Sequence, residues 1–253
     1  MVSIVIIGSG NVAQHLITAF LQSNEVELIQ VFSRQKEKVL HLLSSDKIVS
    51  EYSEIKEADV YLIAVSDNAI AEVSAKLPFE NRLVVHTSGS MSMEILADKN
   101  RRGVFYPLQT FTKSKAVDFR VIPICLEAEN ENDFTSLKTV AQSISSMVES
   151  ISSEQRKALH VAAVFVCNFV NHLYQIGQEI CEEHHLSFEL LQPLILETAQ
   201  KITKLSPKEA QTGPAKRNDT TTINAHLQLM TDANQKEIYQ LLTKSIIDHG
   251  KKL

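Results

Sequence analysis

The chain begins with a short apolar run that ends at a closely spaced pair of glycines. Residues 3–8 read SIVIIG, and Gly8-Ser9-Gly10-Asn11-Val12-Ala13 leads into a helical pattern over residues 11–22. Only 7 of the 253 residues are glycine, so two within three positions are a strong local enrichment. A buried strand, a glycine turn and a helix in this order predict the first crossover of a parallel α/β sheet.

The turn has the G-x-G-x-x-A spacing of a dinucleotide-binding motif. Gly8 permits a tight turn, Gly10 lets the backbone approach a pyrophosphate, and Ala13 is small enough for the helix to pack on the sheet. The helix N-terminus attracts phosphates. A tight turn without a ligand is the alternative, but the strand before it and the helix after it argue against that. We expect the following residues to bind a dinucleotide: Gly8, Ser9, Gly10, Asn11, Val12 and Ala13.

The end of the next predicted strand indicates which dinucleotide is bound. Residues 26–32 read VELIQVF and are followed by Ser33 and Arg34. An NAD site would place Asp or Glu here to bond the ribose 2′-hydroxyl. A hydroxyl and a guanidinium suit a 2′-phosphate instead, so the sequence favours NADP. The alternative, a solvated helix start, explains the nearby lysines better than it explains Arg34.

Two further strands, residues 59–65 and 82–86, end in polar residues. Carboxyl ends of parallel strands meet at the ligand crevice, so we expect Val65 and Ser66 to line the nucleotide. His86 and Ser88 then lie within reach of a substrate. His86 is equally compatible with a strand-end histidine bonded to backbone.

The whole pattern predicts an α/β fold class: an N-terminal doubly wound Rossmann sheet in residues 1–151 and an all-α C-terminal domain in residues 152–253. Short strands are expected near residues 102–106 and 119–126, and helices over 35–45 and 68–77. The helical half is expected to contain helices over residues 153–181, 185–204, 219–230 and 232–249.

Two segments of the helical half carry unusual polar residues. His160, Asn168 and Asn171 fall within about 80° of one another on an otherwise apolar helix. Buried polar groups need partners, so these three are expected to meet either a ligand or a hydrogen-bond network between helices. After Gly213-Pro214, Arg217 stands in a turn that resembles an anion-holding loop. A plain connection with a solvated Lys-Arg pair is the alternative.

Composition excludes several classes of function. The formal charge is −5 without a basic block, which excludes a nucleic-acid partner. No continuous apolar run approaches about 18 residues and no secretion signal is evident, so we expect no membrane span and a cytoplasmic location. The three cysteines form no CxxC pair and read as reduced thiols. No metal site is expected.

Taken together, these motifs resemble a family that joins a Rossmann-like domain to a helical DUF2520 domain and is described as NADP oxidoreductases. The resemblance rests on residues 8–13, 65–67, 86–90, 107–111, 160–168 and 212–219. It implies the fold of 6-phosphogluconate and β-hydroxyacid dehydrogenases, a group that also holds ketopantoate and pyrroline-carboxylate reductases. It also implies a homodimer formed through the helical domain.

The chain departs from its relatives at the proton donor. Phe165 stands where β-hydroxyacid dehydrogenases have a lysine, and Tyr106 stands before Pro107 where prephenate-type enzymes have a histidine. His160 and His86 remain as candidate donors, because histidine can protonate an alkoxide near neutral pH.

The sequence thus predicts an NADPH-dependent reductase of a small oxo acid or imine, with ketopantoate as one possible substrate type. Asn168 and Ser88 are expected to orient the carbonyl, and Gln109 and Arg217 to bind the substrate. A non-catalytic dinucleotide sensor or scaffold is the alternative. An F420-dependent reductase is a third reading, for which no specific residue is visible.

Overall fold

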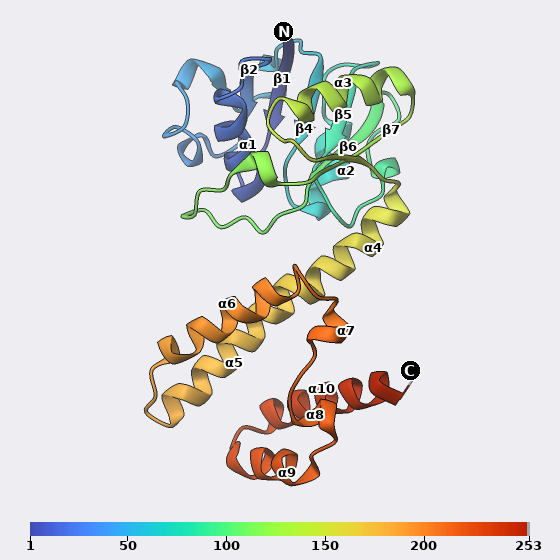
Figure 1. The fold of residues 1–253 in the computed structure, drawn as a ribbon. Coiled ribbons are helices and arrows are strands. Elements are labelled where there is room, and N and C mark those ends of the chain that lie inside the picture. Colours follow the sequence, from blue (N-terminus) through green and yellow to red (C-terminus); the bar gives the residue numbers. More distant parts are fainter. Residues whose placement is uncertain (252–253) are drawn as a thin grey trace. The chain divides into compact units, whose positions relative to one another are not determined.

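The computed structural model describes residues 1–251, except for the side chain of Lys251. The chain divides into two compact units, Met1–Cys167 and Asn168–Leu253, and each is described by itself (Figure 1). The division falls inside one continuous helix, which starts at Ser153, beside the expected boundary at residues 151–152.

The first unit is built on one eight-stranded sheet with the order β3-β2-β1-β4-β5-β6-β7-β8. All strand pairs are parallel except β6 with β7. The strands are β1 (Val2–Ile7), β2 (Val26–Phe32), β3 (Ile48–Val49), β4 (Val60–Ile63), β5 (Leu83–His86), β6 (Arg101–Pro107), β7 (Ile124–Ala128) and β8 (Val148–Ser150). The expected doubly wound fold is confirmed, and strand order reverses between β1 and β4, where such sheets bind ligands.

Side chains that alternate along each strand pack into a separate hydrophobic core on each face of the sheet. Ile4 and Ile6 of β1 pack with the helices α1 (Asn11–Leu21) and α3 (Glu131–Gln142). Val5 and Ile7 pack on the other face, with α2 (Ile70–Ala75). Because β1 is buried on both sides, its sequence is a continuous apolar run, which explains the pattern that opens the chain.

The prediction of a helix over residues 35–45 is wrong. The segment forms only a 3₁₀ turn at Lys36–Lys38, and a second such turn follows at Ser45–Lys47. Val39 is fully buried, whereas Leu40 is exposed, so the segment is anchored at one point rather than along an apolar helical stripe. The helix α3 and the strands β3 and β8 were not anticipated.

The helical half begins with α4 (Ser153–Ala163), which Ser152 starts through a reciprocal capping box with Gln155. A π-helical segment, Val164–Phe169, follows, and then the chain forms α5 (Val170–Glu183), α6 (Gln192–Lys201), α7 (Pro207–Ala210), α8 (Pro214–Arg217), α9 (Thr220–Leu229) and α10 (Ala233–Lys251). Asp219 and Asp232 accept hydrogen bonds from the first turns of α9 and α10, which is typical of an aspartate directly before a helix.

One helix of the described chain, Ser153–Glu183, is long and apolar enough to cross a membrane by length and composition alone. The sequence expectation rested on continuous apolar runs, and this helix is interrupted by His160, Asn168 and Asn171. None of its most apolar window is buried. Core helices of soluble proteins meet the same criterion, so one such helix is weak evidence for a membrane span.

Candidate active site

The carboxyl ends of β1, β2, β4, β5 and β6 surround one cavity of about 1020 Å³. Every residue that lines it belongs to the first unit. It brings together most of the residues predicted to bind cofactor or substrate: Gly8, Ser9, Gly10, Asn11, Val12, Ser33, Arg34, Val65, Ser66, Ser88, Gln109 and His160. Residues far apart in the sequence therefore share one site, as the doubly wound topology requires.

The two glycines of the turn are needed for different reasons. Gly8 has φ +138°, and a Cβ there would lie 2.1 Å from the Ala64 carbonyl oxygen, so the fold itself demands glycine. Gly10 has an ordinary φ of −73°, and a Cβ there would meet nothing within 4 Å. Since the fold leaves this space empty at the N-terminus of α1, it fits a phosphate that approaches the backbone.

Side chains around the glycine turn are held by packing and by contacts with the segment that follows β6. Ala13, in the first turn of α1, is fully buried against the sheet, which is the packing role expected of it. The Asn11 amide donates to the Phe111 carbonyl at 3.1 Å, and His15 Nε2 lies 3.1 Å from the Thr112 carbonyl. The segment after β6 is therefore tied to the first turn of α1.

At the end of β2, Ser33 and Arg34 differ in whether their side chains are free to bind a ligand. Ser33 is buried, and its hydroxyl donates to the Gln35 carbonyl and accepts from the Gln35 N–H. Arg34 is exposed on the cavity wall and forms no ion pair with the described residues. Arg34 is thus the group that can pair with an anion, while Ser33 shapes the turn that presents it.

His86 is fully buried, and both of its ring nitrogens are engaged by backbone. The Ser88 N–H donates to Nδ1 at 3.1 Å, so Nε2 carries the proton and donates to the Ser92 carbonyl at 3.2 Å. Burial, with help from the Arg156 charge, lowers the pKa of His86 to about 4. His86 does not line the cavity, and this geometry argues against it as a proton donor.

Ser88 holds the loop that follows β5. Its Oγ accepts from the backbone N–H groups of Ser90 and Met91, each at 3.1 Å. Ser90 Oγ donates in turn to Asp67 at 2.6 Å. Ser88 therefore faces the cavity as part of a hydrogen-bonded turn.

His160 meets a residue that sequence reasoning did not assign to the site. The Tyr106 hydroxyl lies 3.2 Å from His160 Nδ1, and both residues line the cavity. Burial raises the pKa of Tyr106 to about 12, so its phenol stays protonated at neutral pH. The only sequence signal was that Tyr106 replaces a relative's histidine before Pro107.

Gly89, in the loop after β5, is where that loop meets the Tyr106–His160 pair. A Cβ at Gly89 would lie 2.7 Å from both His160 Nδ1 and Tyr106 Cζ. The missing side chain is thus what allows the imidazole and the phenol to approach the loop. A methyl group here would have to displace one of the two rings.

Three predicted substrate residues lie elsewhere or are otherwise engaged. Gln109 lines the cavity, and its side-chain oxygen accepts from the Thr110 N–H. Asn168 and Arg217 belong to the second unit, where Arg217 ends α8. The π-helical segment Val164–Phe169 changes the turn per residue on which the predicted polar stripe was counted. The roles of Asn168 and Arg217 stay predictions.

Comparison with known proteins agrees with this geometry. The family model described as "NADP oxidoreductase coenzyme F420-dependent" matches residues 3–89, and "Domain of unknown function (DUF2520)" matches residues 122–246. A crystal structure from Bacteroides fragilis, titled a "putative NADP oxidoreductase", is 39% identical with a TM-score of 0.88 and covers 98% of both chains. A search of curated proteins found no match.

More distant structures share the fold. A Plasmodium falciparum pyrroline carboxylate reductase with NADP bound is 12% identical, covers 98% of this chain and 100% of its own, and has a TM-score of 0.62. An Aspergillus terreus reductive aminase in complex with NADPH and ethyl-5-oxohexanoate is also 12% identical, covers 99% of this chain and 95% of its own, and has a TM-score of 0.71.

The fold and the glycine turn define a dinucleotide-binding protein of the dehydrogenase type. The chain belongs to the family of NADP oxidoreductases in which a Rossmann domain is followed by a DUF2520 domain. The resemblance inferred from the sequence motifs is confirmed.

Proposed function

We propose that the protein is an NADPH-dependent reductase of a small oxo acid or imine, and that His160 supplies the proton. The observation that carries the proposal is the shared cavity, which the glycine turn, Arg34 and the His160–Tyr106 pair all line. When bound, NADPH supplies the hydride. The residues of the chain supply position, charge and the proton.

The contact between Tyr106 and His160 orients the ring for proton transfer. In the donor form the ring is an imidazolium: Nδ1–H donates to the Tyr106 oxygen, and Nε2–H has no partner among the described residues. Nε2 gives its proton to the substrate oxygen or nitrogen, which leaves a neutral ring with its proton on Nδ1, and Tyr106 holds that ring in place.

At the cofactor, the N-terminus of α1 and the backbone at Gly10 hold the pyrophosphate, and Arg34 holds the 2′-phosphate. On the substrate side, Ser88 orients the reacting group and Gln109 binds the rest of the molecule. Asn168 and Arg217, both of the second unit, keep the substrate roles predicted for them from the sequence alone. Arg217 suits a carboxylate. The fold neighbours named as a pyrroline carboxylate reductase and a reductive aminase support imines beside oxo acids.

The helical domain forms a homodimer in this proposal. Large apolar side chains of the second unit are exposed, including Leu190, Leu194 and Leu241 at 71%, 62% and 68%. A monomer rarely exposes so much apolar surface, so a second copy is expected to cover it. Light scattering after gel filtration should give the mass of two chains rather than the 28.3 kDa of one. The unpaired cysteines support a reducing, cytoplasmic location.

The test of the reductase proposal is turnover. Purified protein with NADPH and a panel of oxo acids and cyclic imines should consume NADPH with at least one substrate, and His160→Gln should lose turnover while still binding NADPH. The non-catalytic sensor is the competing function, favoured by Phe165 in place of a lysine. NADPH binding without turnover across the panel would support the sensor and contradict the reductase.

A further inference from the structure

Arg156 is a buried cation that the proposed chemistry does not use. It is 1% exposed, which is rare for arginine because removing a charge from water is costly. It lies four residues before His160 on the same helix, α4, so the two side chains share one face of that helix. Arg156 does not line the cavity.

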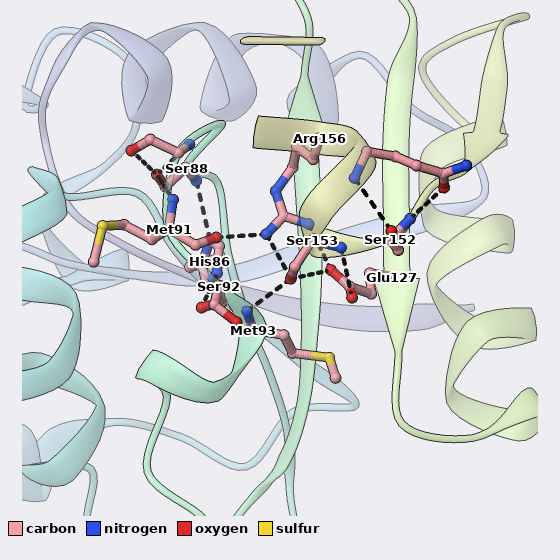
Figure 2. Close-up of polar contacts among 11 residues, drawn as sticks. His86, Ser88, Met91, Ser92, Met93, Glu127, Ser152, Ser153 and Arg156 are labelled. Atoms are coloured by element: carbon pink, nitrogen blue, oxygen red, sulfur yellow. Dashed lines mark hydrogen bonds and ion pairs between the residues drawn. The ribbon is translucent and has the colours of Figure 1, made fainter. Parts of the chain in front are cut away.

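The Arg156 guanidinium joins three segments of the first unit, as Figure 2 shows. Nη1 pairs with Glu127 of β7 at 2.6 Å, and Nη2 donates to the Met91 carbonyl in the loop after β5. Nη2 also donates to Ser153 Oγ at 3.0 Å, in the first turn of α4.

Ser153 closes this network. Its N–H and Oγ donate to the two carboxylate oxygens of Glu127 at 2.9 and 2.7 Å, and its Oγ accepts from the Met93 N–H at 3.1 Å. The start of α4 is therefore bonded to β7 and to the same loop that Arg156 contacts.

The same loop carries the residue that confines His160. Residues 88–93 are tied to His86 through Ser88 and Ser92, and to α4 through Met91 and Met93 (Figure 2). Gly89, within this loop, approaches His160 and Tyr106 so closely that a Cβ would not fit. A shift of the loop relative to α4 would thus change the space that the imidazole occupies.

Stability alone is a poor explanation for this arginine. A buried ion pair often gives no net stabilisation over apolar packing, because desolvation offsets the attraction. Arg156 Nε, moreover, has no hydrogen-bond partner in the described part of the chain. What the guanidinium provides is several bonds in fixed directions, from one plane, to three segments.

We propose that Arg156 is a positioning residue: it fixes α4 against the loop at residues 88–93 and thereby holds the His160 imidazole against Tyr106. It does so together with Glu127 and Ser153. The consequence for turnover rests on the proposed function, whereas the effect on the geometry of His160 does not.

The test is the state of the His160 ring in the full-length protein. Spectra of ¹⁵N-histidine-labelled protein report the protonation of each ring nitrogen, and His160→Gln identifies the His160 signals. Tyr106→Phe gives the reference spectrum of a ring that has lost its partner. Arg156→Met is expected to move the His160 signals toward those of Tyr106→Phe.

A matched control is a second arginine–glutamate pair of the first unit. Arg102 of β6 pairs at 2.6 Å with Glu129, which directly follows β7, and among the described residues its hydrogen bonds do not reach the loop at residues 88–93. Arg102→Met removes an arginine–glutamate pair and should leave the His160 signals unchanged. If both variants move them equally, or if Arg156→Met leaves them as in the wild type, the proposal is overturned.

Milder variants cover the case in which Arg156→Met does not fold. Ser153→Ala keeps the charge pair and removes the three bonds of the hydroxyl, with Glu127, Met93 and Arg156. It should shift the His160 signals in the same direction by a smaller amount. Wild-type signals in Ser153→Ala and Glu127→Gln alike would contradict the proposal. NADPH affinity, followed by NADPH fluorescence, should stay within about twofold in these variants. Failure of the wild type to bind NADPH would refute the proposed function and leave the NMR comparison intact.

Discussion

The Tyr106 hydroxyl and the His160 Nδ1 atom lie 3.2 Å apart, although 54 residues separate them in the sequence. Tyr106 lies one residue before the end of β6 and His160 lies in α4, so the contact joins the sheet to the long helix. Both residues line the cavity.

Replacing Tyr106 with Phe should impair turnover more than binding. The variant keeps the ring but frees His160 Nδ1, and we expect kcat to fall about tenfold, the equivalent of about 1.4 kcal/mol, with NADPH affinity unchanged. Tyr61→Phe is the control, because it removes a buried hydroxyl that bonds Ala58 and Lys56 away from the cavity. Equal kcat values for Tyr106→Phe and wild type would contradict a positioning role for the phenol.

The two glycines of the turn should respond differently to alanine. Gly10→Ala places a methyl group in open space, so thermal unfolding should match the wild type while the NADPH dissociation constant rises at least about tenfold. Gly8→Ala collides with Ala64 and should lower the melting temperature as well. Calorimetry and NADPH fluorescence measure both effects. Unchanged NADPH binding in Gly10→Ala would show that the pyrophosphate does not lie there.

Arg34 should discriminate between the two nicotinamide dinucleotides. Charge-assisted hydrogen bonds to a phosphate contribute about 1.5–3 kcal/mol, so Arg34→Met should weaken NADPH binding by about ten- to a hundredfold and leave NADH binding nearly unchanged. Titrations of both dinucleotides give the ratio. Lys38→Met serves as the control, because Lys38 does not line the cavity. Equal losses for NADPH and NADH would refute recognition of a 2′-phosphate by Arg34.

His86 should make folding stability depend on pH. Its pKa is about 4 in the folded protein against 6.5 for the free group. The unfolded chain therefore takes up a proton as the pH falls below 6.5, the folded protein does not, and stability decreases until about pH 4. Between about pH 7.5 and 5 the loss from this residue is about 2 kcal/mol.

Urea unfolding at both pH values measures this loss. His86→Asn keeps an acceptor near the Ser88 N–H and has no titrating ring, so its stability should depend less on pH than that of the wild type. The same pH dependence in both proteins would show that His86 does not carry the effect.

The features that can be predicted from the sequence are those that depend on residues close together in the chain. The continuous apolar run of β1, the glycine turn and α1 are neighbours in the chain, and their geometry follows from burial on both faces and from the backbone freedom of Gly8. The caps at Asp219 and Asp232 are local in the same sense.

The rest depends on long-range packing. No periodicity shows that Tyr106 meets His160, or that Glu127 and Met91 gather around Arg156, because each partner comes from a different element. The sequence allowed His86 either a role at the substrate or hydrogen bonds to backbone. In the structure both of its ring nitrogens are bonded to backbone groups. The π-helical segment Val164–Phe169 could not be predicted from a count at uniform α-helical spacing.

The close approach of Gly89 to both rings restricts the routes by which related chains can diverge. A larger residue at position 89 becomes tolerable only after position 106 or 160 has first changed to something smaller. Substitutions at these three sites are therefore expected to be ordered in time, and a homologue with a side chain at 89 should also have lost the tyrosine or the histidine.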